Sequence, residues 1–419
     1  MRILIITKYA WDDKIASGNT LSNFFSNWQD TTFYTVYCRD GLPSNTCCNH
    51  YYSVSPINLI KNLFTPWRIG RVVNLTNRPT TKADNAEGRL TEISKFSSVF
   101  TYIYDTLYTT RLWLNKRLKT YIKEANPDVV FCFGVTDAFN YYLIKYIKSN
   151  VNKPIVSYFV DDLYKTDTRW WHFFKRSWNN RLIDIARFST KRYAISRMMC
   201  EEYSMIMERD FDLITKGCIF GELKQKNNNP MKITYAGNLL YGRDKTLIKL
   251  VSLIQSINQV NKVLFHLDIF TATQLDNQKK SLLNIEGCST LHTPVSYDEI
   301  RTIQSESDIV LYVESFVPEQ IKVVRLSFST KVTDCLQSGS MVLAIGPKTI
   351  ATIQYLESIP GVVVSDIDSL QFLLNHLSQN PKMIAEYAVA TNMYARNNLS
   401  VSCTRQHLQN DFLTLITAN

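Results

Sequence analysis

The sequence predicts an α/β protein made of two similar units, each a parallel sheet with crossover helices. The chain has 419 residues, more than the roughly 150 residues of a typical single domain. Short β-branched runs alternate with helical patterns in both halves, which favours parallel sheets. A polar stretch, ELKQKNNN, is followed by Pro230 and separates the halves. We expect an N-terminal domain at 1–221, a linker at 222–231, a C-terminal domain at 232–385, and helices at 386–419 that could cross back to the first domain.

The first half opens with a β-branched run that predicts a buried strand. A polar turn around Gly18 follows, and then apolar residues at helical spacing. A later strand ends at Asp161 and Asp162. The region before the third strand is less regular, although residues 102–122 have helical spacing. The expected strands are 2–8, 32–38, 128–133 and 154–160.

The second half repeats the alternation of strand and helix. Parallel strands joined by helices place their carboxyl ends at one edge, where ligands bind. The sequence therefore predicts two Rossmann-like domains facing a cleft. The expected strands are 232–236, 263–270, 309–313, 341–345 and 362–364, and the expected helices are 246–257, 297–305, 331–338, 383–394 and 405–415.

Composition narrows the classes of partner. The chain has 47 basic and 37 acidic residues, a net charge of +10, which favours anionic partners. Nine cysteines lack metal-ligand spacing and six histidines occur singly, so we expect no metal site. Basic and aromatic residues interleave over 169–181 without a recognised nucleic-acid motif, and we expect no nucleic-acid partner. No stretch approaches the roughly 20 apolar residues that span a bilayer. We expect a cytoplasmic protein.

The segment 58–71 mixes basic and aromatic side chains, including Lys61, Phe64, Trp67 and Arg68. Such a mixture is typical of a surface that lies on a membrane or covers an acceptor. Ordinary amphipathic helices packed on the sheet would give the same pattern. Under the first interpretation the protein meets the inner face of the membrane.

The most informative motif is SFSTKVTDCLQSG, residues 327–339. Ser329 or Thr330 can cap the start of a helix, and apolar positions three and four apart face the sheet. Lys331 lies in the first turn, where a cation opposes the helix dipole by a few tenths of a kcal/mol. An anion bound at this end would offset that cost. Asp334 lies three residues further on and shares with Lys331 a face next to the apolar one. A solvated surface lysine is the alternative.

A second cation follows the first strand of the C-terminal half. Gly237 and Gly242 permit tight turns between this strand and the next helix. Arg243 comes directly after the second glycine, and we expect the helix to begin beyond it. Because both cations follow carboxyl ends of parallel strands, Arg243 and Lys331 could converge on one diphosphate. A surface salt bridge is the alternative for Arg243.

These residues carry a resemblance to a known family. The Gly18-Asn19 loop, PDVVF at 127–131, AISRM at 194–198, YAGNL at 235–239 with Gly242-Arg243, and KVTDCLQSG at 331–339 occur in the order found in family 4 glycosyltransferases. The sequence thus resembles glycosyltransferase group 1, retaining enzymes with the GT-B fold, of the polysaccharide-biosynthesis type. The similarity spans nearly the whole chain, more loosely over 51–123.

The resemblance implies transfer of a hexose from a UDP- or GDP-sugar to a glycan or lipid-linked glycan, without a metal and with no cofactor beyond the nucleotide-sugar substrate. It places the diphosphate on Arg243 and Lys331, with backbone amides near Gly18. It assigns the nucleotide ribose to Asp334, where the family usually has a glutamate. The other positions implied at the donor are Asn238, Ser329 and Thr330.

Two departures concern the reacting sugar. The first of the family's two glutamates falls at Leu326, and Glu319 could substitute for it. The family's histidine after the fourth strand is absent, so Asp161 or Asp162 could take its catalytic place, unless they simply cap the loop. Two other functions remain open, a nucleotide-sugar epimerase on the same fold and a catalytically silent module that binds a nucleotide or another anion.

Overall fold

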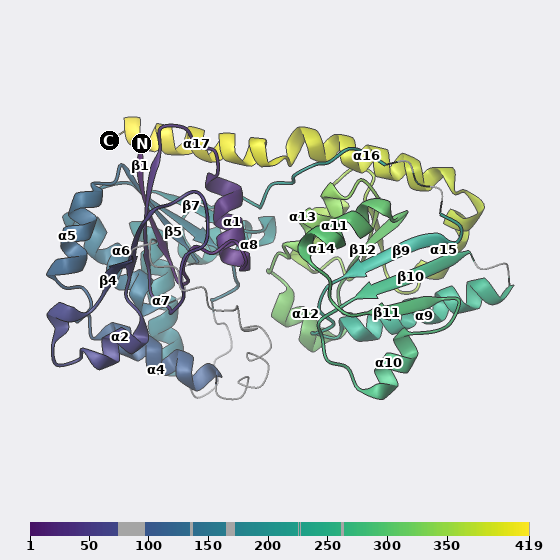
Figure 1. Cartoon of the computed structure of the whole chain (residues 1–419), viewed down its shortest axis with the longest axis horizontal. Helices are drawn as coiled ribbons and strands as arrows, with labels where there is room; N and C mark the ends of the chain where they lie inside the picture. The colour runs from purple at the N-terminus through teal and green to yellow at the C-terminus, as the bar shows by residue number, and fades with distance from the viewer. Residues whose placement is uncertain are drawn as a thin grey trace. The chain divides into compact units, whose positions relative to one another are not determined.

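A computed structural model describes residues 1–73, 97–134, 137–164, 172–224, 226, 228–260 and 264–418. The chain forms two compact units (Figure 1). The first contains residues 1–195, 200–214 and 405–419, and the second contains 196–199 and 215–404. Residues 215–231, which the sequence divides between the first domain and a linker, thus belong to the second unit.

The first unit is built on an eight-stranded sheet in the order β4-β3-β2-β1-β5-β6-β7-β8. Neighbouring strands run parallel except for β3 and β4, which are antiparallel. The strands are β1 (Arg2–Thr7), β2 (Thr32–Tyr37), β3 (His50–Ser53), β4 (Arg71–Val73), β5 (Val129–Phe133), β6 (Ile155–Phe159), β7 (Lys191–Ala194) and β8 (Asp212–Leu213).

The helical spacing at 102–122 corresponds to two helices, α4 and α5. Arg111 between them has a positive φ of 58°, which interrupts a right-handed helix. The Asn115 side chain then caps α5, accepting a hydrogen bond from the Leu118 N–H at 3.2 Å. The helices of this unit are α1 (Ala16–Phe25), α2 (Pro56–Lys61), the 3-10 turn η1 (Pro66–Arg68), α4 (Ser97–Thr109), α5 (Lys116–Ala125), α6 (Ala138–Asn150), α7 (His172–Phe188) and α8 (Arg197–Met207), whose first residues lie in the second unit.

The core of the first unit includes the end of the chain. The C-terminal helix α17 (Val401–Thr417), yellow in Figure 1, contributes Leu408 and Phe412 to a core that also holds Phe25, Trp28 and Phe131. The rings of Phe412 and Trp28 lie 5.6 Å apart in an edge-on contact. The last helix is thus part of the first unit's hydrophobic core.

The second unit has a six-stranded parallel sheet in the order β11-β10-β9-β12-β13-β14. Its strands are β9 (Met231–Ala236), β10 (Phe265–Phe270), β11 (Ser289–His292), β12 (Ile309–Val313), β13 (Met341–Ile345) and β14 (Val363–Ser365). Its helices are α9 (Arg243–Val260), α10 (Asn277–Leu283), α11 (Tyr297–Glu306), α12 (Pro318–Val324), α13 (Lys331–Gln337), α14 (Ala351–Glu357), α15 (Leu370–Gln379) and α16 (Lys382–Asn398).

Two segments singled out in the sequence lie only partly within the described residues. The expected strand at 263–270 begins at Phe265, and residue 263 lies outside the described residues. The aromatic and basic segment 169–181 is described only from His172 onward. In the described part of the chain, no helix is long and apolar enough to cross a membrane.

Candidate functional site

The site is built where two central strands of the second sheet end. β9 and β12 are paired neighbours, with Tyr235 opposite Leu311. Gly237 follows β9, and Glu314 follows β12. Gly242 has a positive φ of 77° and leads into Arg243, the first residue of α9. The helix therefore begins at Arg243, three residues before the start of the expected helix at 246–257.

Arg243 is fixed by a buried network. Its Nε and Nη2 donate to the two carboxylate oxygens of Glu314 at 3.0 and 2.9 Å, and its Nη1 donates to Asn238 Oδ1 at 2.7 Å. Arg243 is 8% exposed and Glu314 2%. The Tyr312 hydroxyl donates to the same carboxylate, and Thr246 donates to the Glu314 carbonyl. Because a bidentate pair holds the guanidinium in one plane, Arg243 has a defined orientation.

Lys331, the first residue of α13, carries the second positive charge of this site. Its Nζ lies 5.9 Å from the centre of the Tyr235 ring. Within the described residues, this ammonium group forms no hydrogen bond and no ion pair. Burial, and then the positive charge of Arg243, lower the pKa of Lys331 from 10.5 to about 8. A buried ammonium group without an acceptor lowers the stability of a folded protein.

Gly237 makes room for this ammonium group. A Cβ added at this position would lie 2.1 Å from Lys331 Nζ and 3.1 Å from the Tyr235 hydroxyl oxygen. The Tyr235 hydroxyl in turn donates to the Asn238 carbonyl at 2.7 Å. The structure thus brings together three residues that the sequence assigns to the donor, Arg243, Lys331 and Asn238. It adds Glu314, which the sequence reasoning missed.

Asp334 lies one turn further along α13, in a separate polar cluster. Its Oδ1 accepts hydrogen bonds from the Tyr297 hydroxyl at 3.0 Å and from Gln337 Nε2 at 3.3 Å. Burial raises the pKa of the Asp334 carboxyl group, and the positive charge of Lys216 opposes this. Together with Arg301, the carboxylate lines a cavity of about 520 Å³. The Asp334 carboxylate thus lines a cavity that a polar ligand could enter.

The remaining donor residues surround the start of α13. The Thr330 side chain does not cap this helix, whereas Ser329 Oγ accepts a weak bond from the Lys331 N–H at 3.4 Å. Glu319 is exposed in the first turn of α12. Leu326, where the family's first glutamate would fall, is fully buried. The carboxylate that contacts Arg243 is therefore Glu314, at the end of β12.

Three residues that the sequence assigns to the site, Gly18, Asp161 and Asp162, lie in the first unit. Gly18 lies inside the first turn of α1, not in a loop before it, and a Cβ there would lie 2.0 Å from the Asp12 carbonyl oxygen. This contact gives a packing reason for the glycine. Asp162 Oδ1 accepts a hydrogen bond from the Tyr203 hydroxyl at 3.2 Å. Asp161 is exposed beside it, so the two carboxylates point differently.

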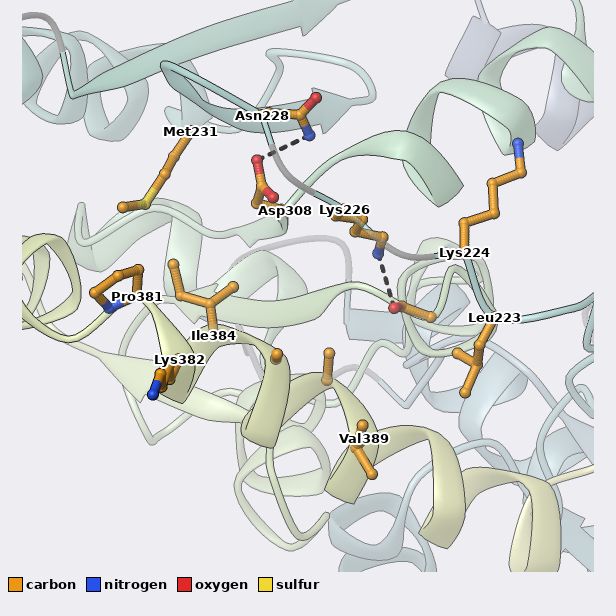
Figure 2. Close-up of a pocket in the computed structure, with 13 residues that line it drawn as sticks. Leu223, Lys224, Lys226, Asn228, Met231, Asp308, Pro381, Lys382, Ile384 and Val389 are labelled. Carbon is orange, nitrogen blue, oxygen red and sulfur yellow. Dashed lines mark hydrogen bonds between the residues drawn. The ribbon is translucent and has the colours of Figure 1, made fainter.

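A larger cavity lies at the opposite edge of the second sheet. It has a volume of about 910 Å³ and is lined by residues before the amino ends of the strands, among them Asp308 and Gly339. Figure 2 shows Lys226 pointing to a carbonyl oxygen of this wall. That oxygen belongs to Gly339, 2.7 Å from Lys226 Nζ. Because ligands of parallel sheets bind at the carboxyl edge, the cluster around Arg243 is the better candidate.

Comparison with known proteins adds evidence on the fold. No family model matches the sequence, and no curated protein matches it. A crystal structure of HepE from Anabaena in complex with UDP has a TM-score of 0.62 and 11% identity, covering 99% of this chain and 100% of that one. A glycosyltransferase from Rickettsia africae has a TM-score of 0.62 and 11% identity, covering 100% and 99%.

A sucrose-phosphate synthase from Thermosynechococcus elongatus is similar over the same length. Its TM-score is 0.57 and its identity 10%, covering 100% of this chain and 99% of that one. At such low identity these likenesses concern the fold. They confirm the predicted fold class, an α/β chain with two Rossmann-like domains of the GT-B type.

Proposed function

We propose that this protein is a glycosyltransferase that moves a hexose from a nucleoside-diphosphate sugar to a hydroxyl of a glycan or lipid-linked glycan. The observation that carries the proposal is the half-buried Lys331 ammonium group, which lies against Gly237 and near Arg243 and has no acceptor in the described structure. Two cations at the carboxyl edge of a parallel sheet suit a diphosphate. HepE, which has the same fold, has been crystallised with UDP and with UDP-glucose.

The cations would act on the leaving group. When the bond between the sugar and the diphosphate breaks, negative charge develops on the diphosphate oxygens. Lys331 would donate to these oxygens, and Arg243, held in plane by Glu314, would stabilise the same charge without reorganising. Loss of one such donor typically slows turnover by about 100- to 1,000-fold. In this proposal the protein's own cations stabilise the charge, and no metal ion is required.

Asp334 is the proposed partner of the nucleotide ribose. An ionised carboxylate can accept hydrogen bonds from both ribose hydroxyl groups, and Tyr297 holds Asp334 in place. Asn238, Ser329, Thr330 and Glu319 remain proposed donor contacts, and Gly18 remains a proposed contact of the diphosphate. We also propose that Asp161 or Asp162 acts beside the reacting sugar, and that transfer retains the anomeric configuration as in family 4.

We further propose contact with the inner face of the membrane through segment 58–71. Phe64 is 92% exposed and Trp67 63%, and the neighbouring Lys61 and Arg68 are exposed as well. Aromatic rings beside cations suit the interface of an anionic bilayer. The full chain should sediment with vesicles containing phosphatidylglycerol, and the double variant Phe64→Ser with Trp67→Ser should not. Equal sedimentation of both proteins would refute this contact.

The proposed activity is tested with UDP, GDP and their sugars. The full chain should bind one of the nucleotides in calorimetry, and Lys331→Met should weaken that binding and slow donor turnover by about 100-fold. Lys245→Met is the matched control, because Lys245 is exposed on the nearby helix α9. Conversion of the sugar to its epimer without an acceptor would identify an epimerase instead. Binding without turnover of any donor would leave a silent binding module.

A further inference from the structure

A second pair of cations lies at the carboxyl edge of the first sheet. β2, β1 and β5 are adjacent in this sheet, and Thr7 pairs with Tyr37 at their ends. Lys8 therefore follows β1 next to Cys38 and Arg39, which follow β2. The Cys38 N–H donates to the Lys8 carbonyl at 3.2 Å. The backbone thus brings the two cationic residues to one place at the edge where parallel sheets bind ligands.

Aromatic rings hold the guanidinium of Arg39. Its central carbon lies 5.0 Å from the centre of the Tyr104 ring and 5.9 Å from that of Tyr108. Tyr108 is fully buried, and its hydroxyl lies 2.6 Å from the Cys38 carbonyl oxygen and 2.8 Å from that of Val54. Arg39 therefore rests on a rigid platform, which reduces the entropy that its side chain would lose on binding.

The contacts of this pair within the described residues leave one nitrogen of Arg39 without an acceptor. Arg39 Nη1 is buried and has no hydrogen-bond partner there, and neither Lys8 nor Arg39 forms an ion pair. The Asp137 carboxylate lies close enough to act on both charges. One of its oxygens also accepts the Asn140 N–H at 3.2 Å, which leaves its negative charge in place. A buried guanidinium nitrogen without an acceptor is costly.

Another arginine of the same unit, Arg181, forms an ion pair with a carboxylate. Arg181 Nη1 donates to Asp105 Oδ2 at 2.8 Å, and Asp105 Oδ1 also accepts the Ala138 N–H at 2.6 Å. The pair formed by Lys8 and Arg39 instead resembles the pair formed by Arg243 and Lys331 in the second unit. Each has two cations at the carboxyl edge of its sheet, and each contains a cationic group that lacks an acceptor.

We infer that Lys8 and Arg39 bind an oxyanion carried by the acceptor, a phosphoryl or carboxylate group. This inference rests on the proposed transfer activity and adds the class of acceptor, which would be an anionic glycan or glycan phosphate. The planar fork of Arg39 matches two oxygens of such a group, and Lys8 adds a point charge. A neutral sugar would offer no negative charge to these two cations.

The test uses simple probes on the full chain. Inorganic pyrophosphate, inorganic phosphate and glucuronate are titrated by calorimetry with saturating UDP present, so that a donor site is occupied. We expect at least one probe to bind, and Arg39→Gln to weaken its binding at least about tenfold. Lys8→Gln, at a half-buried position, should also weaken probe binding. This second variant keeps the test valid if Arg39→Gln does not fold. Arg187→Gln, which removes an exposed charge of α7, is the control and should bind like the parent.

The probes also distinguish the two kinds of acceptor. Binding of pyrophosphate or phosphate alone indicates a phosphoryl group, and binding of glucuronate alone indicates a uronic acid. If no probe binds, or if the Arg39→Gln and Lys8→Gln variants bind as tightly as Arg187→Gln, the inference is overturned. Failure of the proposed function has a different signature, since neither UDP nor GDP would then bind the parent protein. Titration without UDP would in that case still show whether probe binding depends on Arg39.

Discussion

Replacing Lys331 by methionine should stabilise the second unit while it weakens nucleotide binding. Methionine has a similar length and removes the charge, which the structure holds in a half-buried place without an acceptor. A pKa lowered from 10.5 to about 8 corresponds to a cost of about 3 kcal/mol for the charged form. At pH 7 the Lys331→Met variant should therefore be more stable by up to about 3 kcal/mol. A residue that costs this much stability is expected to be retained for binding.

The stability of the parent protein should change with pH in a defined direction, because Lys331 loses its proton at a lower pH in the folded chain than in the unfolded chain. Below about pH 8 Lys331 is charged in the folded and the unfolded chain, so the cost is fully present. Between about pH 8 and 10.5 the folded chain loses this proton first, and the stability of the parent protein should rise toward that of Lys331→Met. UDP should bind less tightly above pH 8, by at most about tenfold per pH unit, since it requires the charged form.

The assay is denaturation by urea from pH 6 to 10, followed by fluorescence, with UDP affinity measured on the same samples. The Lys245→Met control, on an exposed position, should change stability by less than about 0.5 kcal/mol and leave UDP affinity unchanged. The reasoning is refuted if Lys331→Met is less stable than the parent at pH 7, or if it binds UDP equally well.

Three other substitutions test the surroundings of the site and the last helix. Glu314→Gln should cost about 3–5 kcal/mol, because it leaves the buried charge of Arg243 without its partner, and a thermal scan that matches the parent would contradict the pairing. Gly237→Ala should weaken UDP binding with a small loss of stability, since the new Cβ displaces mainly the flexible end of Lys331 and presses more lightly on the Tyr235 hydroxyl. Unchanged affinity in calorimetry would argue against this place for the ammonium group. Phe412→Ala should lower the stability of the first unit by about 3–5 kcal/mol. The measurement is hydrogen exchange of the central strands, and a protection pattern like the parent's would show that the first unit is stable without this contact of α17.

Strand ends were the most predictable part of the site. The β-branched runs predict the central strands closely, since buried parallel strands must be almost wholly apolar. Arg243 follows from this, because it comes after a recognisable strand and turn, whereas Lys331 follows from the helical pattern that it begins. Glu314 could have been found by the same signal. It directly follows the apolar run IVLYV of β12, and a carboxylate at such an end faces the ligand edge.

Other features depend on contacts between distant segments. The spacing at 102–122 looks continuous, yet α4 and α5 are separate because Trp113 turns inward and its indole N–H donates to the Tyr108 carbonyl at 2.9 Å. Gly18 looked like a loop residue and instead packs inside α1 against Asp12. Neither contact leaves a periodic signal, since each depends on the fit of two side chains or backbones.

The sequence by itself determined the two alternating α/β halves and the positions of the two cations, one after β9 and one at the start of α13. It did so because strand and helix periodicity, glycine turns and the carboxyl edge of a parallel sheet are local consequences of the chain. Only the tertiary structure decided which charges are neutralised. Arg243 is paired with Glu314, 71 residues away, whereas the half-buried Lys331 forms no hydrogen bond or ion pair through its ammonium group among the described residues. Pairing depends on distance and burial, and these arise when segments far apart in the chain pack together.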